Sequence, residues 1–187
     1  MLSTRRTARL LAALIAASGC AALAAPAWAG SNSANLQIAA SVISDCAITT
    51  SNVNFGNYDP AVTNATTALT ASGAVTITCT PGSSPVIALG PGLNAVSGQR
   101  NMKTGTSTLS YNLYQPPNTT PGSACTYTSP TAWGDGLADT GSAPTFTPTS
   151  PTSLAPRTYN VCGSIPAAQA AAISASYADT VVATVTF

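Results

Sequence analysis

The sequence predicts an all-β fold, a β-sandwich built from short strands. Runs that alternate apolar and polar residues recur over residues 74–79, 86–89, 109–114, 158–161 and 180–187. Clusters of Gly and Pro separate these runs, and short strands with turn signals at this spacing are typical of sandwiches. The one helical hint, residues 166–172, is short enough to be a single surface turn.

The first 29 residues have the pattern of a secretory signal peptide. Three arginines lie within the first nine residues, an apolar run follows over residues 10–25, and Ala27-Trp28-Ala29 offers small residues for cleavage. A membrane anchor is the alternative, but the run is short for one and Pro26 breaks it. We therefore expect cleavage after Ala29 and export of the remaining chain.

Cys20 lies inside this apolar run. The residues before it resemble a lipoprotein acylation motif only faintly, since Ala17 stands where a large aliphatic residue is usual. We expect Cys20 to be part of the signal peptide and to take no part in the fold.

Charge and composition exclude several classes of function. Beyond the signal peptide the positive residues are Arg100, Lys103 and Arg157, against five Asp, and the chain has neither Glu nor His. Without a basic patch, nucleic acid is not an expected partner. Without His, the usual general base and the commonest metal ligand are missing. We expect no enzyme activity, no cofactor, no metal and no small-molecule substrate.

The aspartates are expected to support turns. Asp135 and Asp139 flank Gly136 and could share a loop that binds calcium, but they lack the dense acidic spacing of a known calcium loop. Asp in Gly-rich turns usually bonds to the nearby backbone. Asp59, before Pro60, and Asp179, before the last strand, are interpreted in the same way.

Four cysteines remain in the exported chain: Cys46, Cys79, Cys125 and Cys162. An even number in an exported protein predicts two disulfides, for which three pairings exist. We favour Cys46–Cys79 with Cys125–Cys162. A zinc site is the alternative, but no two cysteines form a close pair. The Pro- and Thr-rich segment 129–156 lies between the last two, and we expect long loops around one or two strands there in preference to a disordered linker.

An ordered set of motifs resembles a known family. The N-terminal part has CAITT (46–50), NFGNYD (54–59) and GAVTITC (73–79), and the C-terminal part has YNVCGSIP (159–166) and YADTV (177–181). Residues 100–102, 109–114 and 133–136 continue the match between them. Together these stretches resemble the spore coat protein U domain of Csu-type, archaic chaperone–usher pilus subunits.

The resemblance implies a fold and a mechanism. Such pilins are incomplete immunoglobulin-like β-sandwiches completed by donor-strand exchange, in which an extended segment adds to an open sheet edge. The implied partners are neighbouring pilin subunits, a periplasmic chaperone and an outer-membrane usher. The implied location is the periplasm and then a cell-surface fibre, with a role in adhesion and biofilm formation. The chain would be a shaft or adaptor subunit.

The sequence offers candidates for both the donor strand and the acceptor groove. In the extension, residues 30–45, one face of the candidate donor strand carries Leu36, Ile38, Ala40 and Val42. In the domain, residues 46–187, one face of the final strand carries Val181, Ala183, Val185 and Phe187, which we expect to line the acceptor groove. The alternative for the extension is an ordinary first strand of the domain's own sheet.

A monomeric secreted carbohydrate-binding sandwich is the second hypothesis. Trp133 and Tyr127 lie in Gly- and Pro-rich loops and would form its binding platform. A self-complete sandwich would not need the alternating extension, so we favour the pilin interpretation.

Overall fold

The fold is taken from a computed structural model, which describes residues 29–134, 144–173 and 176–187. Of the described residues, those up to Ala40 and those from Ser41 onward belong to two separate units. Cys20, Asp135, Asp139 and the predicted signal peptide up to Trp28 lie outside the described residues. No helix in the described ranges is long and apolar enough to cross a membrane.

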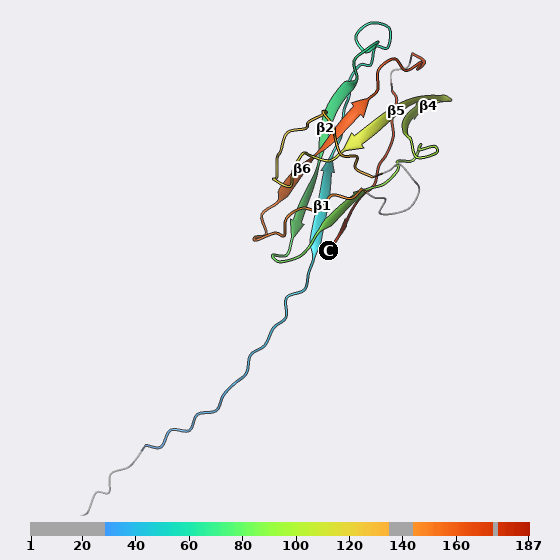
Figure 1. The fold of residues 1–187 in the computed structure, drawn as a ribbon. Coiled ribbons are helices and arrows are strands. Elements are labelled where there is room, and N and C mark those ends of the chain that lie inside the picture. The colour runs from blue at the N-terminus through green and yellow to red at the C-terminus, as the bar shows by residue number, and fades with distance from the viewer. Residues whose placement is uncertain (1–28, 135–143, 174–175) are drawn as a thin grey trace, which may run out of the picture. The chain divides into compact units, whose positions relative to one another are not determined.

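The described residues contain seven strands, which confirms the predicted all-β class. They are β1 (Cys46–Ser51), β2 (Leu69–Cys79), β3 (Val86–Leu89), β4 (Arg100–Thr104), β5 (Ser107–Tyr114), β6 (Arg157–Ile165) and β7 (Ala183–Thr186). Five of them form an antiparallel sheet in the order β1-β2-β6-β5-β4, in which β2 lies beside β6 and β6 beside β5 (Figure 1). The other two, β3 and β7, pair antiparallel in a second sheet.

Alternating side chains explain why these segments are strands with one buried face. On β2, Val75 and Ile77 are buried, whereas Thr76 and Thr78 are only half-buried. Leu109, Tyr111 and Leu113 on β5 follow the same period of two. Burying each such side chain contributes about 1.5–3 kcal/mol, so this pattern fixes which face of the large sheet packs on the core.

Three aromatic side chains occupy the middle of the core. The ring centroids of Trp133 and Phe146 lie 5.2 Å apart, and those of Phe146 and Tyr159 lie 5.1 Å apart in an edge-on arrangement. Trp133 is fully buried, and its indole N–H donates to the carbonyl oxygen of Ile87 on β3 at 3.0 Å. This bond satisfies the indole's polar group and ties the loop that carries Trp133 to the second sheet.

A tyrosine corner lies in the connection between β6 and β7. The hydroxyl of Tyr177 donates to the carbonyl oxygen of Ala172, five residues upstream, at 2.7 Å. In immunoglobulin-like sandwiches such a Tyr marks the start of strand F, and the two sheets have the orders A-B-E-D and C-F-G. Here β1-β2-β6-β5 corresponds to A-B-E-D and β3-β7 to C-F, with β4 as an added edge strand. The fold is thus an immunoglobulin-like sandwich in which no described residue occupies the place of strand G.

Two disulfides cross-link the domain in the pairing that the sequence analysis favoured. Cys46 and Cys79 face each other across the β1–β2 ladder, with their Cα atoms 4.1 Å apart. Cys125 joins its loop to Cys162 on β6, with a Cα separation of 5.5 Å. Closing loops of 33 and 37 residues stabilises the fold by about 4 kcal/mol each in the chain-entropy model.

The segment after β1 lies so close to β6 that only Gly fits beneath it. A Cβ atom at Gly163 would lie 2.6 Å from Val53 Cγ1 and 2.7 Å from Phe55 Cζ. Real Cβ atoms do not approach other carbons so closely. Gly163 therefore sets how deeply Val53 and Phe55 can pack against the core.

Replacing Gly163 with Ala should lower the free energy of unfolding by about 1–3 kcal/mol, since the added methyl overfills this contact. Chemical denaturation of residues 30–187 measures the loss. In the double variant Gly163→Ala with Val53→Ala, the loss in unfolding free energy should be smaller than the sum of the two single losses, because Val53 Cγ1 is one of the two clashing atoms. Strictly additive losses would show that the two residues do not compete for the same space.

Candidate strand-binding groove

One edge of β7 has no strand beside it among the described residues. Gly90 N donates to Val182 O at 2.8 Å, which places the backbone of Val182, and by alternation that of Thr184 and Thr186, toward β3. The N–H and C=O groups of Ala183 and Val185 consequently point to the other side. This edge is a row of main-chain donors and acceptors available for another strand.

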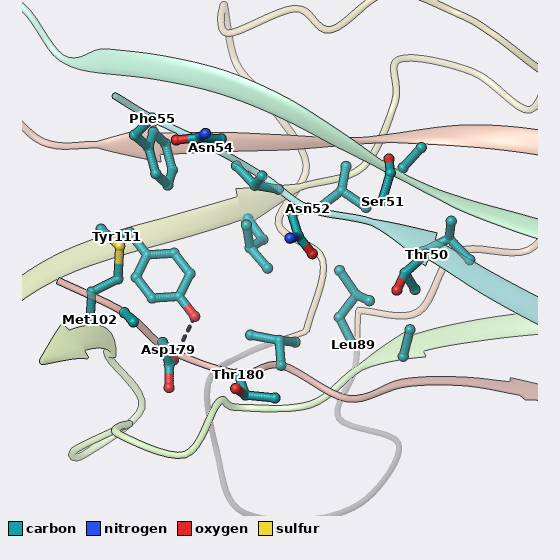
Figure 2. A pocket seen from close by; sticks show the side chains of 18 of the residues that line it. Thr50, Ser51, Asn52, Asn54, Phe55, Leu89, Met102, Tyr111, Asp179 and Thr180 are labelled. Carbon is teal, nitrogen blue, oxygen red and sulfur yellow. Dashed lines mark hydrogen bonds between the residues drawn. The ribbon is translucent and has the colours of Figure 1, made fainter. Parts of the chain in front are cut away.

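A groove of about 550 Å³ lies between this edge and the segment that leaves β1. Residues 50–55 line one side and residues 177–181 with Ala183 line the other. Figure 2 shows Thr50, Ser51, Asn52, Asn54 and Phe55 across the groove from Asp179 and Thr180. Since β1 is itself the edge strand of the larger sheet, two strand edges border the groove.

The floor of the groove is the hydrophobic core. Val75, Leu89, Leu113 and Val161 line it, and all four belong to the buried core cluster. The groove is thus an opening in the sandwich through which an added side chain would reach both sheets. An extended segment with apolar residues at alternate positions fits such a site, because every second side chain would point into the floor.

Polar groups occupy one part of the groove wall. Tyr111, on β5, donates its hydroxyl to Asp179 Oδ2 at 2.6 Å, as the dashed line in Figure 2 marks. Burial, together with this bond, raises the pKa of Tyr111 far above its ordinary value. The phenol therefore stays protonated and acts as a hydrogen-bond donor throughout the physiological pH range.

The predicted acceptor residues divide into two groups. Val181 and Ala183 line the groove, as expected for residues that point toward the core. Val185 also packs against the core but lies outside the lining, and Phe187 is about half exposed.

The predicted donor residues lie in a segment without regular secondary structure, residues 29–45. The side chains of Leu36, Ile38 and Val42 are each at least 85% exposed, and Ala40 is exposed as well. Large aliphatic residues rarely remain in water along one continuous face without a binding role.

Asp179 differs from the expectation that it only supports a turn. Its carboxylate accepts hydrogen bonds from Tyr111 and Asn94, which lie 68 and 85 residues away in the sequence. Asp59 does behave as a turn former, since its Oδ1 accepts from the backbone N–H groups of Ala61 and Val62. The YADTV motif singled out Asp179, but nothing in its immediate sequence specifies such distant partners.

Sequence reasoning also missed one wall of the groove. Residues 52–55 follow β1 without forming a strand, and their role depends on the close approach that Gly163 permits. The NFGNYD motif lies partly in this wall, but the motif alone does not predict where it lies in the fold.

The carbohydrate-platform hypothesis is wrong for Trp133. This side chain is fully buried, so its ring cannot stack on a sugar. Tyr127 is 36% exposed, and its hydroxyl already donates to the carbonyl oxygen of Ala71 at 3.0 Å. The structure leaves this hypothesis without the pair of exposed rings on which it depended.

Comparisons with known proteins agree with the fold. The family model described as the Spore Coat Protein U domain matches residues 32–184. "Protein U" of Myxococcus xanthus is 35% identical over 197 residues, covering 95% of this chain and 96% of that protein.

Among solved structures, the chain is similar to one from the CsuC–CsuE chaperone–tip adhesion subunit pre-assembly complex of archaic chaperone–usher Csu pili of Acinetobacter baumannii. The TM-score is 0.52 and the identity 22%, over 78% of this chain and 40% of the solved one. At this identity the likeness concerns the fold.

Trp133 provides an optical test of its burial, because the sequence beyond residue 29 contains no other Trp. Its fluorescence in the folded chain of residues 30–187 should resist quenching by iodide and should not change when oligosaccharides are added. The unfolded chain serves as the control and should be quenched readily. Efficient quenching of the folded chain, or a shift caused by sugar, would contradict the buried placement.

Proposed function

Because the chain belongs to the Spore Coat Protein U domain family, we propose that it is a structural subunit of a chaperone–usher surface fibre. Its groove accepts an extended strand from another subunit, and its own residues 35–42 supply such a strand in turn. The observation that carries this proposal is the free edge of β7 above an open part of the core.

The free edge and the groove require a partner for physical reasons. An unpaired edge beside exposed core is a template for uncontrolled pairing and aggregation. A bound strand would satisfy the main-chain groups of Ala183 and Val185 and would cover the floor residues Val75 and Leu113. An exported chain with this fold therefore needs a segment that occupies the groove at every stage.

The extension has the chemistry that the groove requires. Leu36, Ile38, Ala40 and Val42 alternate with polar or small residues, so one face of an extended strand would be apolar. These side chains are exposed in the isolated chain, which leaves them available to a neighbour. The fitting of alternate side chains into an open sandwich supports donor-strand exchange as the mode of polymerisation.

Assembly would then proceed through two partners. A periplasmic chaperone would fill the groove first, and the extension of the next subunit would replace it at an outer-membrane usher. The similarity to a chain from a chaperone–subunit complex supports the first partner. The chain would act as a shaft or adaptor subunit, exported by the predicted signal peptide, in a fibre that serves adhesion and biofilm formation.

The double change Ile38→Asp with Val42→Asp tests the donor role. Two carboxylates in an apolar groove would cost several kcal/mol each, so polymerisation should fail. The chaperone-bound subunit should still be recovered in soluble form, because the change lies outside the sandwich. Yields of soluble subunit and of surface fibres are measured for the variant and the original chain.

Gln37→Asp with Ser41→Asp is the matched control. It adds the same two charges to the same segment, but on the opposite face of the extended strand. Fibres should form with this control. If the Ile38 and Val42 variant is degraded even with the chaperone present, the segment is a strand of its own domain and the donor assignment is wrong.

A further inference from the structure

Asp179 lies where the chain crosses from one sheet to the other. Immediately before it, Ala178 exchanges two backbone hydrogen bonds with Lys103 of β4, in the larger sheet. Immediately after it, Thr180 O accepts from Leu93 N at 3.1 Å, in continuation of the β3–β7 pairing. The position of Asp179 therefore determines where the free edge of the last strand begins.

The carboxylate of Asp179 joins segments that are far apart in the sequence. Its Oδ2 accepts from Tyr111 of the larger sheet, and its Oδ1 accepts from the backbone N–H and the side-chain amide of Asn94 at 3.2 and 3.0 Å. Asn94 lies in the connection between β3 and β4, so the carboxylate links β5, this connection and the segment that leads into β7. Hydrogen bonds to an ionised acceptor are about twice as strong as neutral ones, which makes this cluster of Asn94, Tyr111 and Asp179 a firm connection.

The loop that carries Asn94 packs directly against Asp179, and Arg100 binds the residues at the start of this loop. Gly92 has φ +89, and a Cβ atom there would lie 2.1 Å from Asp179 Oδ2, so no space remains between loop and carboxylate. Arg100 donates from Nε to Gly90 O at 3.1 Å and from Nη2 to Leu89 O at 3.0 Å. These bonds hold the end of β3 in place. The hydrogen bonds between Asn94 and Asp179 then position the start of the last strand relative to it.

We propose that Asp179 is a positioning residue for strand capture. By joining Tyr111 to Asn94, it holds the edge at Thr180–Ala183 in the extended geometry that an incoming strand must meet. The role rests on the proposed function. It differs from simple support of a turn because the partners come from β5 and from the β3–β4 connection, and because Asp179 and Tyr111 themselves line the groove.

The experiment measures the rate at which the groove captures a strand. The full exported chain is purified with its chaperone and carries Ile38→Asp and Val42→Asp, so that its own extension cannot compete. It is mixed with a fluorescent peptide of residues 33–44, and capture is followed by anisotropy. Asp179→Asn, Tyr111→Phe and Asn94→Ala are compared in this background. Asp59→Asn is the matched control, since it changes a turn aspartate that does not line the groove.

Asp179→Asn and Tyr111→Phe should each slow capture about tenfold, the factor expected for loss of one hydrogen bond to a charged group. The double variant should be no slower than Asp179→Asn alone, because Asp179→Asn already removes the ionised acceptor to which the Tyr111 hydroxyl donates. Asn94→Ala should have a smaller effect, since its backbone N–H still donates. The Asp59→Asn control should capture the peptide at the rate of the background chain. Once formed, the peptide complexes of all variants should melt at similar temperatures, whereas a purely structural role for Asp179 would lower the melting temperature of its variants.

Two negative results have different meanings. If the chain that carries only Ile38→Asp and Val42→Asp captures no peptide, the proposed function is wrong, and the positioning role of Asp179 is wrong as well. If the background chain captures the peptide and the Asp179 and Tyr111 variants match the Asp59 control, strand binding stands and the positioning role is overturned.

Discussion

The structure depends on one geometric constraint: a two-stranded sheet is too narrow to cover the core face of a five-stranded sheet. Among the described residues, β3 and β7 are the only strands of the second sheet, and Phe146 bridges to Ile87 on the side of β3 away from β7, so the β7 edge keeps unpaired main-chain groups and part of the core remains open. Neither feature is stable in water by itself. The rest of the domain holds the sandwich together around that opening.

A disulfide, a close backbone approach and a hydrogen-bonded carboxylate hold the residues around the opening in place. The Cys46–Cys79 disulfide fixes β1 to β2, so the strand that leads into one groove wall stays in its sheet. Gly163 lets Val53 and Phe55 lie against β6, which shapes that wall. On the other wall, Asp179 joins Tyr111 to Asn94 and sets where the free edge begins. Under the proposed function, a groove whose walls are already in place limits the ordering cost of binding largely to the incoming segment.

Much of the fold could be predicted from the sequence, because period-two alternation reports a buried sheet face directly. Residues 74–79 and 109–114 are predicted as strands in this way, and the four cysteines form the pairing that the sequence analysis favours among the three possible ones. The carbohydrate-binding hypothesis places Trp133 wrongly, because Gly and Pro around an aromatic residue resemble an exposed loop, whereas its indole donates to Ile87 O inside the core. The long-range bonds of Asp179 could not be predicted, since they depend on which distant segments meet in the fold and not on local pattern.

The central claim is that the β7 edge is unpaired until another chain supplies a strand. Hydrogen exchange of individual amides tests it directly, comparing the chain alone with the chain in fibres. Ala183 and Val185 should exchange fast in the free chain and become protected in fibres, whereas Thr184, which faces β3, should be slow in both. Protection of Ala183 and Val185 in the isolated chain, equal to that in fibres, would contradict the account.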